Sequence, residues 1–190
     1  MARLITGLTP IREQALQERL FVAMSRRYEP SIRREIARAM RAFGRSDLDA
    51  LSIHEERMKR ILIRLYTESF RIFGKRLLNS IVKSQDGHEL KKDIPETPQF
   101  DLARKIWIRT QSSLAVTQIA GTTQDQALNI IRIALEDSVT DGLGEIQTGK
   151  LIQSRISDGS VQLSKLRGRM IARTESHGSS NASTQMAAKS

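Results

Sequence analysis

Apolar residues recur at helical spacing through most of this 190-residue chain. The longest such run would form one helix over residues 52–83, with Gly74 as a possible kink, and its apolar positions are Met58, Ile61, Leu65, Ile72, Leu77 and Ile81. Residues three, four or seven positions apart share a face of an α-helix. Aromatic residues make up only 4% of the chain, so a core must be built from Leu, Ile, Ala and Met, which favour helices. We therefore predict an all-α protein, elongated and multi-helical, with long N-terminal helices and a smaller C-terminal helical domain.

Prolines and glycines indicate where the helices of the first half begin and end. Pro10 suits the first position of a helix, which the apolar spacing extends over 10–28. Pro30 lacks a backbone N–H and disfavours helical geometry at the residue before it, so this helix should stop or kink there. A second helix is expected over 31–43, closed by Gly44 as a left-handed cap.

Glycines also mark the expected helix ends of the second half, because a glycine readily forms the left-handed cap that ends a helix. Threonine hydroxyls can likewise cap the start of a helix. The expected elements, in order, are a helix over 100–120 closed by Gly121, a helix capped by Thr122 and Thr123, a break at TDGLGEIQTG (140–149), a short helix over 146–156, a turn at Asp158 and Gly159, and a final helix from Leu163.

The stretch SQDGHELKKDIPETPQ, residues 84–99, is the best candidate for a linker. It contains one glycine and two prolines and almost no apolar residue, a composition typical of turns and loops. We expect it to divide the chain into a basic helical region, 1–83, and a second helical domain, 100–190.

The charge of the chain is basic and unevenly distributed. Lys and Arg number 31 against 21 Asp and Glu, a formal net charge of +10, and residues 1–83 carry 18 basic and nine acidic side chains. Such an excess attracts a polyanion such as nucleic acid, or an anionic surface. The first region is therefore the expected site of such contacts.

A row of arginines is the sharpest feature of the basic region. At about 100° per residue, these arginines fall on one helix face, opposite the apolar face that carries Ile32, Ile36 and Met40. Guanidinium groups one turn apart suit a row of phosphates, because each can bind in a bidentate way and release counterions. The alternatives are the solvated face of an ordinary surface helix and a membrane surface. The arginine row consists of Arg34, Arg38, Arg41 and Arg45, joined by Arg27 if the helix continues through Pro30.

No catalytic or metal-binding constellation stands out in the sequence. The absence of cysteine excludes disulfides and Cys-based zinc sites, and His54, His88 and His177 have no ligand-spaced partners. The segment GEIQTGKL, residues 144–151, imitates a phosphate-binding loop but ends in Leu151 where a hydroxyl is needed and follows no apolar strand. We therefore expect no enzyme activity, no metal and no cofactor.

The sequence also contains no run of about 18 apolar residues, the length that a membrane span needs. No signal-peptide pattern opens it. A soluble, unsecreted protein without a membrane span is therefore the expectation.

The end of the final helix allows two interpretations. In one, Arg173 and Glu175 are surface charges on a helix that Gly178 terminates before a frayed serine-rich tail. In the other, the two residues are polar anchors that pair with neighbouring helices and fix how the terminal helix docks. Both residues lie off the apolar face, and spacing alone does not choose between the interpretations.

The segment RGRMIARTESHGSSNASTQMAA, residues 167–188, resembles the signature of phage head-morphogenesis proteins, the minor head proteins of tailed bacteriophages related to the F protein of phage Mu. In that family an Ile-Ala-Arg-Thr-Glu stretch is followed by small residues and an asparagine. Two departures are His177-Gly178, where the family usually continues through apolar or Ala-rich residues, and the end of the chain, beyond which members commonly continue. The matching residues are Ile171, Ala172, Arg173, Thr174, Glu175, Asn181 and Ala182.

The resemblance covers roughly residues 100–190 and implies a structural role. It implies a low-copy minor head protein that associates with the portal protein, and possibly with scaffold or major capsid protein, and that contacts packaged or ejected DNA. Its place would be the head interior of the virion, reached from the host cytoplasm during assembly, and this chain would be a truncated form. The alternative is a non-phage helical module that binds nucleic acid, with an accidental match to the signature.

Overall fold

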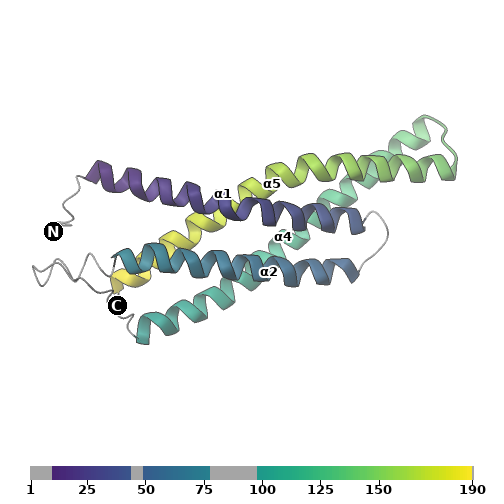
Figure 1. The fold of residues 1–190 in the computed structure, drawn as a ribbon. Coiled ribbons are helices and arrows are strands. Elements are labelled where there is room, and N and C mark those ends of the chain that lie inside the picture. Colours follow the sequence, from purple (N-terminus) through teal and green to yellow (C-terminus); the bar gives the residue numbers. More distant parts are fainter. Residues whose placement is uncertain (1–9, 44–48, 78–97, 190) are drawn as a thin grey trace, which may run out of the picture. The chain divides into compact units, whose positions relative to one another are not determined.

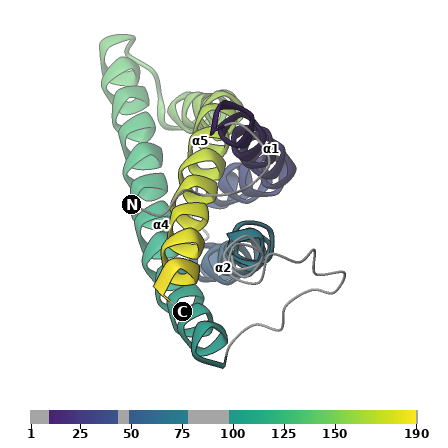
Figure 2. The same ribbon diagram turned by 90° about the vertical axis from the view of Figure 1, so that its left-hand side faces the viewer.

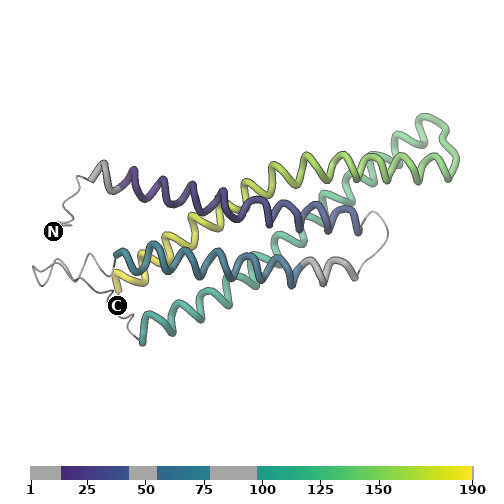
Figure 3. Tube along the Cα trace, in the orientation of Figure 1, coloured from purple at the N-terminus to yellow at the C-terminus, as the bar shows by residue number. Residues whose placement is uncertain are grey.

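The computed structural model describes residues 10–43, 49–77 and 98–189, and these residues contain no strand. The predicted all-α class is confirmed (Figure 1). A π-helical segment, Phe70–Gly74, directly follows the second helix, and Figure 3 traces the same path along the Cα atoms. The long helices are α1 (Pro10–Phe43), α2 (Asp49–Ser69), α4 (Pro98–Thr140) and α5 (Glu145–Lys189).

The chain forms two compact units that each draw on several segments. The first unit combines Met1–Arg27, Leu62–Gln111 and Ala172–Ser190, and the second combines Tyr28–Ile61 and Ser112–Ile171. Each long helix therefore contributes one segment to each unit. Most of the expected linker lies outside the described residues, and the division at 84–99 stays a prediction.

The core of the first unit is aromatic. The ring of Phe70 lies 5.3 Å from that of Trp107 and 6.2 Å from that of Phe100, and Tyr66 lies 5.2 Å from Trp107. Tilted and edge-on pairs at these centroid distances are favourable arrangements of aromatic rings. Gly74 makes room for this cluster, since a Cβ there would lie 2.8 Å from Cζ of Phe100. Half of the eight aromatic residues of the chain thus lie in this one cluster.

The second unit packs small residues between α4 and α5, while Ile32, Ile36, Met40 and Met58 fill its core from α1 and α2. Its α4 and α5 segments run antiparallel side by side (Figures 1 and 2), with Gly159 against Ile130 and an ion pair of 2.6 Å between Arg155 and Asp137. Small side chains at buried positions let helices approach closely. The buried small residues of this pair are Ser112, Ala115, Ala120, Thr123, Ala127, Ala134 and Ser138 on α4 and Ser160, Ser164 and Gly168 on α5.

The break expected at TDGLGEIQTG is confirmed as the connection between α4 and α5. Gly142 has a φ of 63°, and the N–H groups of Gly142 and Leu143 donate to the carbonyls of Val139 and Ser138 at 3.2 and 2.9 Å. This hydrogen-bond pattern, with glycine in the left-handed region, is the Schellman motif that ends helices. Gln147 then accepts a hydrogen bond of 3.4 Å from the N–H of Gly144 at the start of α5, half of a capping box.

Other expected helix ends were wrong. α4 continues through Gly121, and α5 runs through Asp158, Gly159 and Gly178 to Lys189 without a turn, a short separate helix or a frayed tail. α1 likewise runs through Pro30 as one helix. A proline inside a helix costs about 3 kcal/mol and a glycine about 1 kcal/mol relative to alanine, and burial of the flanking helix faces offsets costs of this size.

The expected caps Thr122 and Thr123 were also wrong, because both lie inside α4. Their hydroxyls donate to carbonyls one turn earlier, for Thr123 to that of Ile119 at 2.6 Å. Gly44, expected to close a helix, lies outside the described residues, next to the end of α1 at Phe43. In the ranges that the structure covers, no helix has both the length and the apolar content needed to cross a membrane.

Candidate functional site

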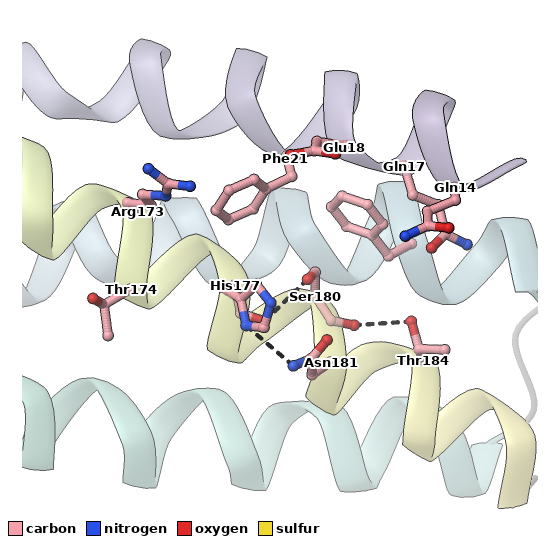
Figure 4. Close-up of a pocket in the computed structure, with 11 residues that line it drawn as sticks. Gln14, Gln17, Glu18, Phe21, Arg173, Thr174, His177, Ser180, Asn181 and Thr184 are labelled. Atoms are coloured by element: carbon pink, nitrogen blue, oxygen red, sulfur yellow. Dashed lines mark hydrogen bonds between the residues drawn. The ribbon is translucent and has the colours of Figure 1, made fainter. Parts of the chain in front are cut away.

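A pocket of about 620 Å³ in the first unit gathers polar side chains from α1 and α5 (Figure 4). The α1 residues are spaced i, i+3, i+4 and i+7, so they share one face of that helix. The residues that line the pocket are Gln14, Gln17, Glu18 and Phe21 of α1, Phe73 of the π-helical segment, and Arg173, Thr174, His177, Ser180, Asn181 and Thr184 of α5.

The central side chain of the pocket is His177. Its imidazole meets the ring of Phe21 edge-on at a centroid distance of 5.6 Å, and its Nδ1 lies 3.2 Å from Nδ2 of Asn181 (Figure 4). The hydroxyl of Ser180 donates to the carbonyl oxygen of His177 at 3.0 Å. This serine therefore hydrogen-bonds within its own helix and is not set against a base.

The pocket also holds one carboxylate and one guanidinium that have no partner in the part of the chain that the structure describes. Glu18 and Arg173 both line it, and neither makes a hydrogen bond or ion pair with another described residue. Charge-assisted hydrogen bonds are about twice as strong as neutral ones. Both groups are therefore available to the charged or polar groups of a ligand.

Other residues of the signature segment hold α5 in place. Ile171 and Ala172 are buried, and Glu175, on another side of the helix from Arg173, accepts a hydrogen bond from the hydroxyl of Tyr66 on α2. Burial raises the pKa of Glu175, and the Tyr66 hydrogen bond opposes this rise. Glu175 thus has the geometry of a polar anchor, whereas Arg173 is an exposed charge.

A buried arginine holds α5 to α4 within the second unit. Arg167 donates to Oγ1 of Thr122 at 2.6 Å, to Oε1 of Gln126 at 2.8 Å and to Oγ1 of Thr123 at 3.3 Å. Burial lowers its pKa, although a guanidinium stays charged at any physiological pH. No sequence pattern had assigned a role to this residue.

The described arginines of the row are divided between the two units. Arg34, Arg38 and Arg41 are exposed on α1 in the second unit, but Arg38 pairs with Glu35 at 2.7 Å. Nε of Arg34 donates to the carbonyl of Pro30 at 3.3 Å, and Arg41 has no partner among the described residues. Arg27 belongs to the first unit and pairs with Glu68. Arg45 lies outside the described residues.

The structure also bears on the loop-like segment GEIQTGKL and on metal binding. Residues 145–150 of the loop-like segment form the first turns of α5, after a turn that follows helix α4 and not a strand. Across the described residues, no group of three His, Asp or Glu side chains is placed to hold a metal ion. Neither observation gives a second candidate site beside the pocket.

Sequence reasoning missed the α1 wall of the pocket, Tyr66 and the role of His177. The polar face of α1 was visible as i, i+3, i+4 and i+7 spacing, but its facing helix was not. Tyr66 carried a clearer signal, because a tyrosine inside an apolar helical run needs a partner for its hydroxyl when buried.

Comparisons with protein-family models, with curated proteins and with solved structures found no match to this chain.

Proposed function

We propose that this chain is a structural minor head protein of a tailed bacteriophage, which associates with the portal protein and contacts packaged or ejected DNA. The observation that carries the proposal is the position of Arg173. It lies in the pocket without a partner among the described residues, while Ile171, Ala172 and Glu175 of the same signature segment hold the helix from the other sides. A fixed helix that presents an unpaired guanidinium is suited to bind an acidic partner surface.

The DNA contact is assigned to the arginine row. Arg34 and Arg41 are exposed, with their guanidinium groups outside any ion pair recorded for the described residues. Both lie on one face of α1, in the region of the chain with twice as many basic as acidic side chains. Guanidinium groups in a row bind successive phosphates without reading sequence. The expected mode is therefore non-specific backbone binding.

The portal association is tested by capture of this chain on the portal protein encoded beside it. Arg173→Ala should reduce capture about tenfold or more, the usual scale for loss of a charged hydrogen-bond donor at an interface. Arg169→Ala is the matched control, since Arg169 is exposed on the same helix and lies outside the pocket. Equal capture of the Arg173 variant and the wild type would contradict the proposal.

The second candidate is a non-phage helical protein that binds nucleic acid. The arginine row favours it, because this row needs no portal protein and no signature. Absence of portal capture at low and moderate salt, together with tight binding to bare DNA, would support this candidate over the first.

A further inference from the structure

A row of large apolar side chains runs along α4 in the second unit and faces solvent. Leu114, Leu128, Leu135 and Val139 are 55%, 48%, 44% and 81% exposed, whereas the buried positions of the same segment are mainly alanine, serine and threonine. An ordinary surface helix buries its large apolar residues and exposes its polar ones. This segment buries Val116 and Ile119 but leaves the four large apolar side chains above exposed, which gives it a second apolar face that a partner would cover.

We call Leu114, Leu128 and Leu135, together with Gly121 between them, the leucine row. Its spacing indicates that the partner is a helix. Leu114, Gly121, Leu128 and Leu135 recur every seven residues, the repeat that keeps a seam facing another helix. The row covers about 30 Å of α4 at 1.5 Å per residue. Binding to a flat protein surface or to lipid would not require apolar residues at intervals of seven.

The charges beside the row are of both signs. Asp125 and Arg132 are exposed on the same flank, four residues after Gly121 and Leu128 respectively. A membrane-binding face would carry mainly cations there. Arg132 donates to Asn129 at 3.1 Å and lies 3.9 Å from Glu136 on its own helix, and Asp125 has no partner among the described residues.

These charges complement each other in a symmetric pair. A two-fold axis at Leu128, with the two α4 helices antiparallel, sets Leu128 against its own copy and Leu135 against Gly121, where the missing side chain makes room. The same axis puts Asp125 of one copy and Arg132 of the other on the same side of the seam, about 1.5 Å apart along the helix direction. Each ion pair then occurs twice, as an isologous interface requires.

We propose that the leucine row of α4 is the interface for a second copy of this chain, packed antiparallel about a two-fold axis at Leu128. The proposal goes beyond the portal and DNA roles and depends on neither. The partner is another copy because Gly121, Leu128 and Leu135, with Asp125 and Arg132 beside them, are complementary to themselves about this axis.

Because the chain contains no cysteine, a disulfide that forms after one cysteine is introduced must join that residue to its copy in a second chain. Leu128→Cys places two thiols at the axis, where a disulfide needs Cβ atoms about 4 Å apart, and mild oxidation should link nearly all of the protein as dimers. Leu166→Cys on α5, 69% exposed in the wild type, should stay monomeric. Equal linking of the two variants would overturn the proposal.

Charge exchange tests the register. Asp125→Arg and Arg132→Glu should each raise the dissociation constant of the dimer about tenfold, by placing like charges across the axis, and the double variant should restore it. Sedimentation velocity measures these constants, and circular dichroism checks that each variant is folded. A wild-type chain that sediments as a monomer at tens of micromolar overturns the proposal, as does a double variant no tighter than the single ones.

Discussion

The phenol of Tyr66 and the carboxyl of Glu175 form a hydrogen bond between α2 and α5 in the first unit. Tyr66→Phe removes the donor and leaves the partly buried carboxylate without it, which should lower the free energy of unfolding by roughly 1–3 kcal/mol. Urea denaturation at neutral pH measures this loss. With Glu175→Gln as background, the loss should shrink, because a neutral amide is cheaper to leave unpaired. Equal losses in both backgrounds would show that the charge of Glu175 adds nothing to this hydrogen bond.

The same pair gives the stability of the protein a defined pH dependence. Burial raises the pKa of Glu175 in the folded state, so across the interval between its unfolded and folded pKa values the folded chain binds more protons. Stability from this group is therefore full below the ordinary glutamate pKa of about 4.3 and falls as pH rises through the folded pKa.

Glu175→Gln removes this pH-dependent contribution. Its free energy of unfolding, compared with that of the wild type, should change in favour of the variant as pH increases from about 4 to 8. Denaturant titrations at several pH values test the trend, and a difference independent of pH would contradict it.

Arg167 provides a second test at a single residue. Its planar fork reaches Thr122, Thr123 and Gln126 together, which the point-like ammonium of lysine cannot do. Arg167→Lys should therefore cost about 1–3 kcal/mol of unfolding free energy. The exposed Arg169 supplies the control, since Arg169→Lys should change stability by less than about 0.5 kcal/mol. Equal effects at both positions would contradict the assigned role.

For the roles of single residues, the sequence was only partly informative. The 3.6-residue period placed Arg173 and Glu175 off the apolar face, but it left open whether either had a partner. Tyr66, the residue that bonds Glu175, lies 109 positions away, and no local pattern encodes such a distance. Long-range side-chain pairs depend on the tertiary arrangement of helices, which spacing within one helix does not determine.

Among the elements, α1 and α5 meet in the second unit at Gly168. A Cβ on this residue would lie 3.0 Å from Cα and 3.1 Å from N of Arg33, and a backbone cannot move aside as a flexible side-chain end can. Gly168→Ala should therefore lower the free energy of unfolding by about 1–3 kcal/mol, the usual cost of overpacking. Thermal or urea unfolding measures it.

Gly178→Ala is the matched control for this glycine. Gly178 lies inside the same helix, and nothing is within 4 Å of the position that a Cβ would take there, so alanine should stabilise the protein by up to about 1 kcal/mol through helix propensity alone. Opposite signs for the two variants are expected. A destabilised Gly178 variant would indicate that α5 does not continue through this residue.

These glycines explain why helices were predicted well and their ends poorly. Glycine is the commonest residue after a helix end, so Gly121 and Gly178 were natural choices for caps. The sequence cannot distinguish a cap from a glycine that sits inside a helix held by packing. Only the break at Gly142 combined a positive φ with a full set of terminal hydrogen bonds among the described residues, and there the prediction was confirmed.

For the whole molecule, composition was enough for the fold class and not for the arrangement. Scarce aromatics and abundant Leu, Ile and Ala predicted helices, which the structure confirms. The units, however, combine segments from the start, middle and end of the chain. Helical periodicity is a local property, whereas the choice of neighbouring segments depends on which faces fit together. The pocket, formed by α1 and α5, could therefore not be predicted from either helix alone.

Binding of DNA by the whole chain should depend on salt through its arginines. Each phosphate contact contributes about 0.9 to the slope of log affinity against log salt on duplex DNA, so the double change of Arg34 and Arg41 to glutamine should reduce this slope by about 1.8. Arg38→Gln should have a smaller effect than either, because Arg38 already pairs with Glu35. Fluorescence anisotropy over a salt series measures the slopes. If the double variant kept the wild-type slope, the arginine row would not be the DNA contact.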